Sequence, residues 1–286
     1  MTTAREDHGV DALLPAEIAL KAEAVGVQKT GLDALTLLAL AVLAGAFIGL
    51  GAMFATTVLA GADGVLPFGG ARLLAGMVFC LGLILVIVGG AELFTGNALI
   101  VMAWAAGKVQ LRQMLRVWAI VYVGNFIGAI GTALLVFLSG QYLAGRGAVA
   151  EVVLSLALAK ATLPFDHALF LGILCNVLVC LAVWLALGAR TTSGKVLAIL
   201  FPVSAFVVAG FEHSVANMYL VPLGLLVKTW GPAAMWTEIG ADPAAYAALT
   251  WPAFFLGLVP VTLGNIIGGS VLVGGVYWFI YLRRRA

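Results

Sequence analysis

An acid and an imidazole lie side by side in the middle of a long apolar stretch of this chain. Glu212 and His213 are the only Asp, Glu, His, Lys or Arg residues between Lys195 and Lys228. An ionisable side chain at membrane depth is costly, and such residues mark transport paths or binding sites. Because histidine titrates near physiological pH, His213 is suited to handling protons. The pair predicts such a site; in the alternative interpretation, Glu212 caps a broken backbone and His213 is a packing residue.

The composition is that of an integral membrane protein. Of the 286 residues, 63% are hydrophobic and only 10% are charged, whereas soluble domains carry about 25% charged residues. A net charge of +2 leaves no basic face for nucleic acid. Cys80, Cys175 and Cys180 all lie in apolar runs without metal-ligand spacing. We therefore expect no nucleic-acid partner, no metal and no cofactor.

Six apolar stretches are long enough to span a bilayer, which takes about 20 helical residues. The second and fifth stretches each hold more than 30 residues. As straight helices they would exceed a hydrocarbon core of about 30 Å, so they must tilt steeply or break. The sequence therefore predicts an all-α membrane protein with spans over residues 32–60, 73–106, 114–138, 167–189, 196–227 and 251–282.

A polar segment precedes the first span. Residues 11–27 predict a short helix on the membrane surface, with Pro15 in its first turn and Gly26 at its end. This helix could be a simple anchor or a gate. We expect residues 1–30 to form a cytoplasmic amphipathic segment and residues 31–286 to form one six-span domain.

Two patterns recur in the same order along the chain. The pattern G-x-E-x4-N stands at residues 90–97 and again at 210–217, and G-N-x-x-G follows at 124–128 and 264–268. Matching order predicts an internal repeat of three spans. An odd number of spans turns the second copy upside down, and broken backbone at membrane depth has to line a cavity. The predicted repeats cover residues 31–142 and 160–282.

The distribution of lysine and arginine predicts the orientation in the membrane. If both chain ends lie in the cytoplasm, eleven of the 15 basic residues fall on the cytoplasmic side and four fall outside. Cytoplasmic loops of membrane proteins carry such an excess. We therefore expect cytoplasmic amino and carboxyl termini.

Several segments together resemble the formate/nitrite transporter family of bacterial anion channels. They are LLPAEIALKAEAVGVQK, AELFTGN, GILCNVLVCLAVW, FEHSVANM and GNIIGG, and they cover nearly the whole chain. The resemblance implies an aquaporin-like protomer in the bacterial inner membrane, with its second and fifth helices broken. It also implies a homopentamer with one pore in each subunit. The implied substrates are small monovalent anions, with formate first and nitrite or hydrosulfide as alternatives.

The resemblance also assigns roles by position. It implies that His213 is the central pore histidine and that Thr95 is its hydrogen-bonding partner. Lys160 is expected before the fourth span near the outer mouth, and Asn176 and Asn265 are expected on the pore side. The apolar constrictions are expected at Phe79, Leu83 and Phe206, with Leu93, Phe94 and Val179 at or near an inner slit.

The remaining polar residues of the two breaks have a structural interpretation. Glu92 and Glu212 are expected to accept hydrogen bonds from free backbone N–H groups, because a carboxylate facing the pore would repel an anion. Gly96, Asn97 and Asn217 are expected to stabilise the same breaks.

These residues favour transport of a weak acid that loses its charge by taking or sharing a proton beside His213. Passive channelling and obligatory proton symport both remain open. An intramembrane enzyme would use Glu92, Glu212 and His213. However, only one histidine lies at membrane depth, and the chain has no G-x-S-x-G nucleophile motif. We therefore expect no enzymatic activity, and a membrane scaffold is disfavoured because it would need no paired polar breaks.

Overall fold

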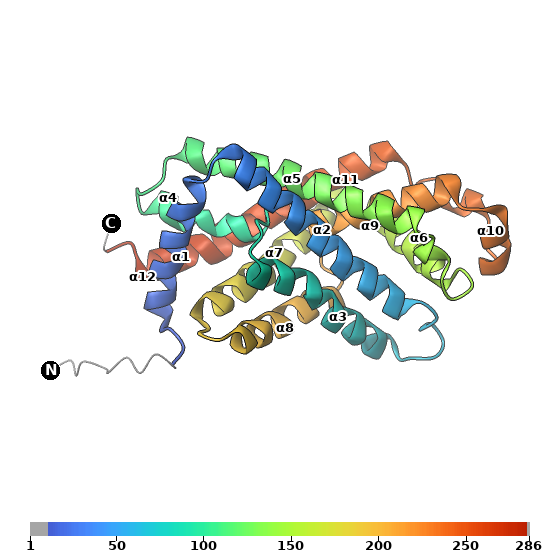
Figure 1. The fold of residues 1–286 in the computed structure, drawn as a ribbon, viewed down its shortest axis with the longest axis horizontal. Helices are drawn as coiled ribbons and strands as arrows, with labels where there is room; N and C mark the ends of the chain where they lie inside the picture. Colours follow the sequence, from blue (N-terminus) through green and yellow to red (C-terminus); the bar gives the residue numbers. More distant parts are fainter. Residues whose placement is uncertain (1–10, 285–286) are drawn as a thin grey trace.

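The computed structural model describes residues 11–284, and every regular element within them is helical. Figure 1 shows the long helices packed into one bundle, with α1 and α12 at one end and α10 at the opposite end. The elements are α1 (Pro15–Thr30), α2 (Ala34–Leu59), α3 (Phe68–Gly89), η1 (Gly96–Ile100), α4 (Val101–Ala105), α5 (Leu111–Leu138), η2 (Gln141–Leu143), α6 (Ala148–Ala161), α7 (Phe165–Gly188), α8 (Thr192–Val208), α9 (Ser214–Trp230), α10 (Ala233–Ile239), η3 (Pro243–Tyr246), α11 (Trp251–Ile266), η4 (Ile267–Gly275) and α12 (Val276–Tyr281).

Five helices in this part of the chain are long and apolar enough to cross a membrane: α2, α3, α5, α7 and the continuous helix Trp251–Tyr281. The predicted stretch 196–227 is not among them because it is divided between α8 and α9, which have 17 residues each. The predicted stretch 73–106 is divided as well, since α3 ends at Gly89 and η1 begins at Gly96. The chain therefore leaves the helix in both stretches that were predicted to break, whereas the predicted stretch 251–282, which is as long as 196–227, forms one continuous helix over Trp251–Tyr281.

A glycine in the left-handed conformation ends the helix before each break. Gly90 has φ of 81° and Gly210 has φ of 71°, values that other L-residues rarely adopt. Two residues later, the N–H groups of Glu92 and Glu212 donate to carbonyl oxygens of α2 and α7, at 3.2 and 3.3 Å. Neighbouring helices therefore supply hydrogen bonds to backbone that is no longer helical, as an apolar environment requires.

Helix α1 is longer than the sequence predicted. It begins at Pro15 as expected, but it continues through Gly26 and ends at Thr30, so the prediction that Gly26 terminates it was wrong. Gly26 is buried, and a Cβ atom there would lie 3.1 Å from the Cβ of Ala103 on α4. The glycine lets two helices pack closely instead of ending one. Residues 1–10 of the predicted amino-terminal segment lie outside the described residues.

Helix α6 was not predicted, because no separate periodic signal distinguishes it from the adjoining spans. It packs against α9 through buried side chains that include Val149, Val153 and Leu154. It precedes α7 in the same way that α1 precedes α2. Each half of the chain therefore begins with a short helix that precedes its first long helix.

Two helix crossings correspond between the halves, α2 with α5 and α7 with α11. Glycines allow the backbones to approach closely there, as is common between membrane helices. A Cβ atom at Gly128 would lie 2.0 Å from the carbonyl oxygen of Val42, and one at Gly268, in the η4 continuation of α11, would lie 2.2 Å from that of Ile173. Both contacts are backbone contacts, so neither neighbour can rotate away.

We expect Gly128→Ala to lower the free energy of unfolding by about 1–3 kcal/mol, because the added methyl group overpacks the crossing of α2 and α5. Gly131→Ala on the same helix is the matched control, since a Cβ there meets nothing within 4 Å. The control should be neutral or stabilising by about 0.5–1 kcal/mol. Thermal unfolding midpoints in detergent compare the two, and equal midpoints would contradict the close crossing.

Candidate functional site

Two cavities enter the bundle from opposite ends. The α1 cavity has a volume of about 510 Å³ and is lined by α1, the first half of α2, the last turns of α3, the first break and parts of α7 and α8. The α6 cavity has a volume of about 260 Å³ and is lined by α6, the last half of α2, the first turns of α3 and the second break. The same two helices, α2 and α3, therefore run from one cavity to the other.

A layer of mostly apolar side chains separates the cavities. Phe79 faces the α6 cavity and Leu83, one turn further along α3, faces the α1 cavity. The ring of Phe206 meets the ring of Phe79 edge to face, with 5.6 Å between centroids, and stacks on the imidazole of His213 at 6.0 Å. Leu93 adds to the layer from the side of the α1 cavity. We call these five residues and Thr95 the separating layer.

His213 is the N-cap residue of α9. Its Nδ1 accepts a hydrogen bond from the N–H of Ala216 at 3.1 Å. The imidazole hydrogen is therefore assigned to Nε2, which lies 3.0 Å from Oγ1 of Thr95. The contact between Thr95 and His213 that the family resemblance implied is present. Both side chains are almost fully buried, and His213 lines the α6 cavity.

Two asparagines hold the broken segments in place. Asn265 accepts the N–H of Ser214 at 2.9 Å and donates to the carbonyl oxygens of Gly172 and Glu212 at 2.8 and 2.9 Å. Asn265 was expected on the pore side; its amide binds backbone groups and the residue lines neither of the two cavities, so the pore-side position stays a prediction. The sequence had singled out its repeat motif but had not assigned a role to the matching residue of the first half.

That matching residue is Asn125 on α5. Its Oδ1 accepts the N–H of Phe94 at 2.8 Å, and its Nδ2 donates to the carbonyl oxygens of Ala41 and Glu92 at 2.8 and 2.9 Å. The three bonds repeat those of Asn265 one for one. Asn176, the other asparagine expected on the pore side, also lines neither cavity and donates to the carbonyl oxygens of Thr95 and Asn265.

The two glutamates bind side chains, not free backbone N–H groups. Glu212 accepts from the ammonium group of Lys160 at 2.8 Å and from the amide of Asn217 at 2.6 Å. The prediction that these carboxylates accept backbone N–H groups was wrong, because asparagine oxygens take the N–H groups of Phe94 and Ser214. Both carboxylates nevertheless lie at the breaks, where they accept hydrogen bonds from polar side chains.

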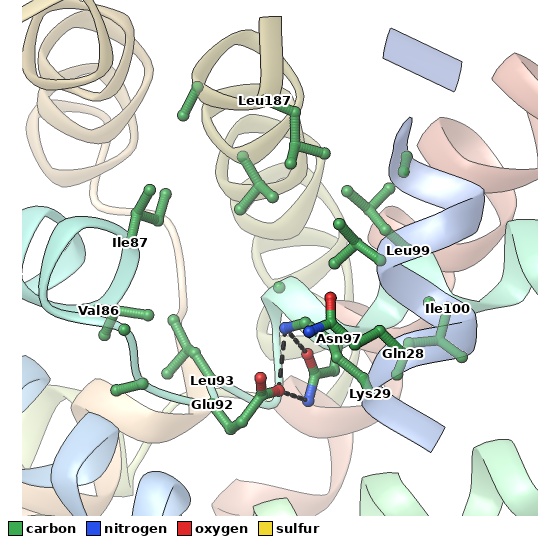
Figure 2. A pocket seen from close by; sticks show the side chains of 18 of the residues that line it. Gln28, Lys29, Val86, Ile87, Glu92, Leu93, Asn97, Leu99, Ile100 and Leu187 are labelled. Carbon is green, nitrogen blue, oxygen red and sulfur yellow. Dashed lines mark hydrogen bonds and ion pairs between the residues drawn. The ribbon is translucent and has the colours of Figure 1, made fainter. Parts of the chain in front are cut away.

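Glu92 has the corresponding pair of partners. Lys29 of α1 donates to Glu92 at 2.9 Å and to Oδ1 of Asn97 at 2.7 Å, and Asn97 donates to Glu92 at 2.9 Å. Figure 2 shows these three side chains meeting at the wall of the α1 cavity, among Val86, Leu93 and other apolar residues. Each break therefore carries one Lys–Glu–Asn cluster.

The pairing of Lys29 with Glu92 was not predicted, although the sequence contains a signal for it. Lys29 stands four residues before Asp33, the N-cap of α2, and Lys160 stands four residues before Pro164, the N-cap of α7. Lys160 does lie directly before the fourth predicted span, but its side chain is only 16% exposed and is bound to Glu212. A lysine at the same distance before the first long helix of each half is the signal that relates the two ion pairs.

The remaining predicted residues divide between the cavities and the core. Gly96 and Asn97 line the α1 cavity together with Leu83 and Leu93. Phe94 is buried against Tyr122, with 4.9 Å between ring centroids, and Val179 is buried on α7. Neither Phe94 nor Val179 lines a cavity. The other four residues predicted for the constrictions each line one of the two cavities; they are Phe79, Leu83, Phe206 and Leu93.

We expect the pair of Lys160 and Glu212 to be strongly coupled. Lys160→Met leaves a buried carboxylate without its counter-charge, which should cost about 3–5 kcal/mol of stability. Adding Glu212→Gln should recover much of that loss, because the uncompensated charge is then gone. Unfolding midpoints of the wild type, both single variants and the double variant give the coupling energy. Strictly additive effects would contradict a coupled ion pair.

Comparisons with known proteins agree with this arrangement. The profile of the formate/nitrite transporter family, described as "Formate/nitrite transporter", matches residues 16–279. The Formate channel FocA of Escherichia coli (strain K12) is 43% identical over 280 residues, which cover 98% of each protein. The Formate channel BtFdhC of Bacillus thuringiensis is 36% identical over 281 residues, covering 95% of this chain and 97% of the relative.

Solved structures give the same result. A structure described as "Pentameric formate channel with formate bound" matches with a TM-score of 0.83 and 41% identity, covering 87% of this chain and 98% of that chain. These relatives are channels and transporters, which sets the enzyme interpretation aside. The apolar helices and these matches identify an integral membrane protein, and the chain belongs to the formate/nitrite transporter family.

Proposed function

We propose that this protein is a channel for small weak-acid anions, with formate as its main substrate. The relatives named as formate channels support the choice of formate. The observation that carries the proposal is the position of the hydrogen-bonded pair His213–Thr95, in the layer between two cavities that enter from opposite ends. The path runs through one cavity, across the separating layer and into the other.

The proposed architecture is six spans in two inverted repeats, in the manner of aquaporins. Matched contacts support it: Asn125 corresponds to Asn265, and the cluster of Lys29 with Glu92 corresponds to that of Lys160 with Glu212. We propose that α1 belongs to the first repeat and α6 to the second, so that the repeats extend over residues 15–138 and 148–281 instead of beginning at the first spans. The channel unit then includes most of the amino-terminal segment that had been set apart as residues 1–30.

We further propose a homopentamer in the bacterial inner membrane, with one path in each subunit and both chain ends in the cytoplasm. The pentameric formate channel that matches this chain supports the assembly. The positions of basic side chains support the orientation. Lys21, Lys29 and Lys195 line the α1 cavity, whereas Arg72 and Lys160 line the α6 cavity. The α1 cavity therefore opens to the cytoplasm.

The separating layer imposes the main barrier to an anion. Moving a bare carboxylate into a dry constriction costs about 20 kcal/mol on an idealised Born scale, and still several kcal/mol after relaxation. A carboxylic acid with a pKa near 3.5 is protonated at pH 7 for roughly 5 kcal/mol, at 1.36 kcal/mol per unit. Crossing as the neutral acid is therefore the cheaper route, and the substrate crosses with a proton.

His213 assists at this step through Nε2. Because Nδ1 is occupied by the N–H of Ala216, the resting imidazole is neutral and presents its hydrogen at Nε2, toward Thr95. An anion that reaches the layer can accept a hydrogen bond from Nε2. Proton transfer through the ring requires Nδ1 to be protonated first, so the bond to Ala216 has to open. The N-terminus of α9 also stabilises negative charge beside the imidazole.

We expect His213→Phe to lower formate flux at least about tenfold, equivalent to about 1.4 kcal/mol in the barrier. The phenyl ring keeps the bulk of the side chain but offers no hydrogen to an anion. Flux is measured in proteoliposomes loaded with the purified protein. His167→Phe is the matched control, because His167 is exposed in the first turn of α7, and it should leave flux unchanged.

His213→Asn separates the imidazole from the start of helix α9. Asparagine is a favoured N-cap residue, so it retains an acceptor for the N–H of Ala216. A loss of flux in both variants ties the effect to the imidazole. Normal flux in His213→Phe, with the protein folded, would refute the central role of this residue.

Substrate preference and proton coupling are tested in the same proteoliposomes. Formate, nitrite and hydrosulfide should all pass, with formate fastest, because each is a small anion of a weak acid. With equal formate on both sides, an imposed pH gradient should drive formate accumulation if protons and anions cross together. Such uptake against a formate gradient would rule out a simple anion pore, and its absence would contradict crossing with a proton. Faster nitrite or hydrosulfide flux would reassign the substrate.

A further inference from the structure

Two lysines at the rim of the α1 cavity take no part in the proposed proton handling at His213. Lys21 of α1 and Lys195 of α8 both line this cavity. The ammonium group of Lys21 donates to the carbonyl oxygen of Leu187 at the end of α7, at 2.8 Å. The ammonium group of Lys195 forms no hydrogen bond or ion pair with any residue between 11 and 284. Both ammonium groups therefore keep free donors beside a cavity of about 510 Å³.

Among residues 11–284, no acidic side chain forms an ion pair with either lysine. The one carboxylate among the residues that line the cavity belongs to Glu92, and it is already bound to Lys29 and Asn97. Lys195 lies in the first turn of α8, which contains no acidic residue. The helix N-terminus adds a positive partial charge there, where a lysine is unfavourable.

The cations also repel one another. Burial and, next to it, the positive charges of Lys195 and Arg190 lower the pKa of Lys21 from its usual range. Such a lowering means that the charged form of Lys21 is disfavoured in the folded protein without an anion. A bound anion with two negative charges would offset the repulsion and would satisfy the free donors at the same time.

We propose that Lys21 and Lys195 form a binding site for a small dicarboxylate dianion at the rim of the α1 cavity. Each ammonium group can bind one of the two carboxylate groups of a dicarboxylate. A monocarboxylate such as formate has only one carboxylate group and cannot bind both lysines in this way. Apolar side chains beside the lysines, including Val25 and Leu187, can pack against the methylene carbons between the carboxylates.

The site has a consequence that rests on the proposed function. A dianion would need two protons to cross the separating layer as a neutral acid, so it stays at the rim. Bound there, it occupies the cavity through which formate has to pass. A dicarboxylate is therefore an inhibitor of formate flux and not a substrate.

Calorimetric titration of succinate into the purified protein tests the binding site directly. At constant low ionic strength, the double variant Lys21→Gln with Lys195→Gln should bind at least about tenfold more weakly than the wild type. Arg112→Gln is the matched control, because Arg112 is exposed at the start of α5 and does not line the cavity. Unfolding midpoints check that all three proteins are folded.

Inorganic phosphate and acetate serve as comparison probes in the same titration. Acetate carries one charge and phosphate is compact, so both should bind more weakly than succinate. Succinate binding that is undetectable, or equal in the wild type and the double variant, overturns the site. Phosphate binding as tight as that of succinate overturns the assignment to dicarboxylates.

Formate flux with succinate on both sides of the proteoliposome membrane tests the inhibition. Succinate should slow flux through the wild type and should have less effect on the double variant. Flux that is unaffected by bound succinate overturns the inhibition. A protein that binds succinate but conducts no formate overturns the proposed function alone, and normal formate flux without succinate binding overturns the site alone.

Discussion

The structure depends on how the polar groups of two broken helices are satisfied inside an apolar bundle. A buried donor or acceptor without a partner costs about 1–3 kcal/mol, and each break exposes several. Asn125 and Asn265 each make three hydrogen bonds to the breaks. Because these amides come from α5 and α11, the third and sixth predicted spans hold the second and fifth in position. The close helix crossings at the glycines serve the same purpose, because they bring α5 and α11 close enough for the two asparagines to reach the breaks.

The charged clusters solve a second problem at the same breaks. A lone buried carboxylate would be strongly destabilising, but Glu92 and Glu212 each have a lysine and an asparagine as partners. Both lysines come from the short helices that precede the spans, α1 and α6. These helices are therefore part of the bundle's electrostatic balance and are not only surface anchors. The arrangement leaves neither glutamate as an unpaired negative charge facing an incoming anion.

The two halves share a framework but differ where the chemistry takes place. In the pattern G-x-E-x4-N, the residue after the glutamate is Leu93 in the first half and His213 in the second. Both belong to the separating layer, and each lines a different cavity. Only one imidazole therefore lies in the layer, and its hydrogen-bonding partner Thr95 comes from the other half. A symmetric pair of breaks produces a single asymmetric site, to which both halves contribute.

The amino-acid sequence by itself determined the membrane class, the six apolar stretches, the two breaks and the central position of His213. These features depend on local composition, on stretch length and on repeated patterns, all of which can be read along the chain. Only the tertiary structure decided that Lys29 pairs with Glu92, that Asn265 binds backbone, and that Phe94 and Val179 lie in the core. These outcomes depend on which side chains from distant helices meet, because a buried polar group takes whichever partner the packing brings within reach. The continuation of α1 through Gly26 has the same cause, since contact with α4 outweighs the local tendency of glycine to end a helix.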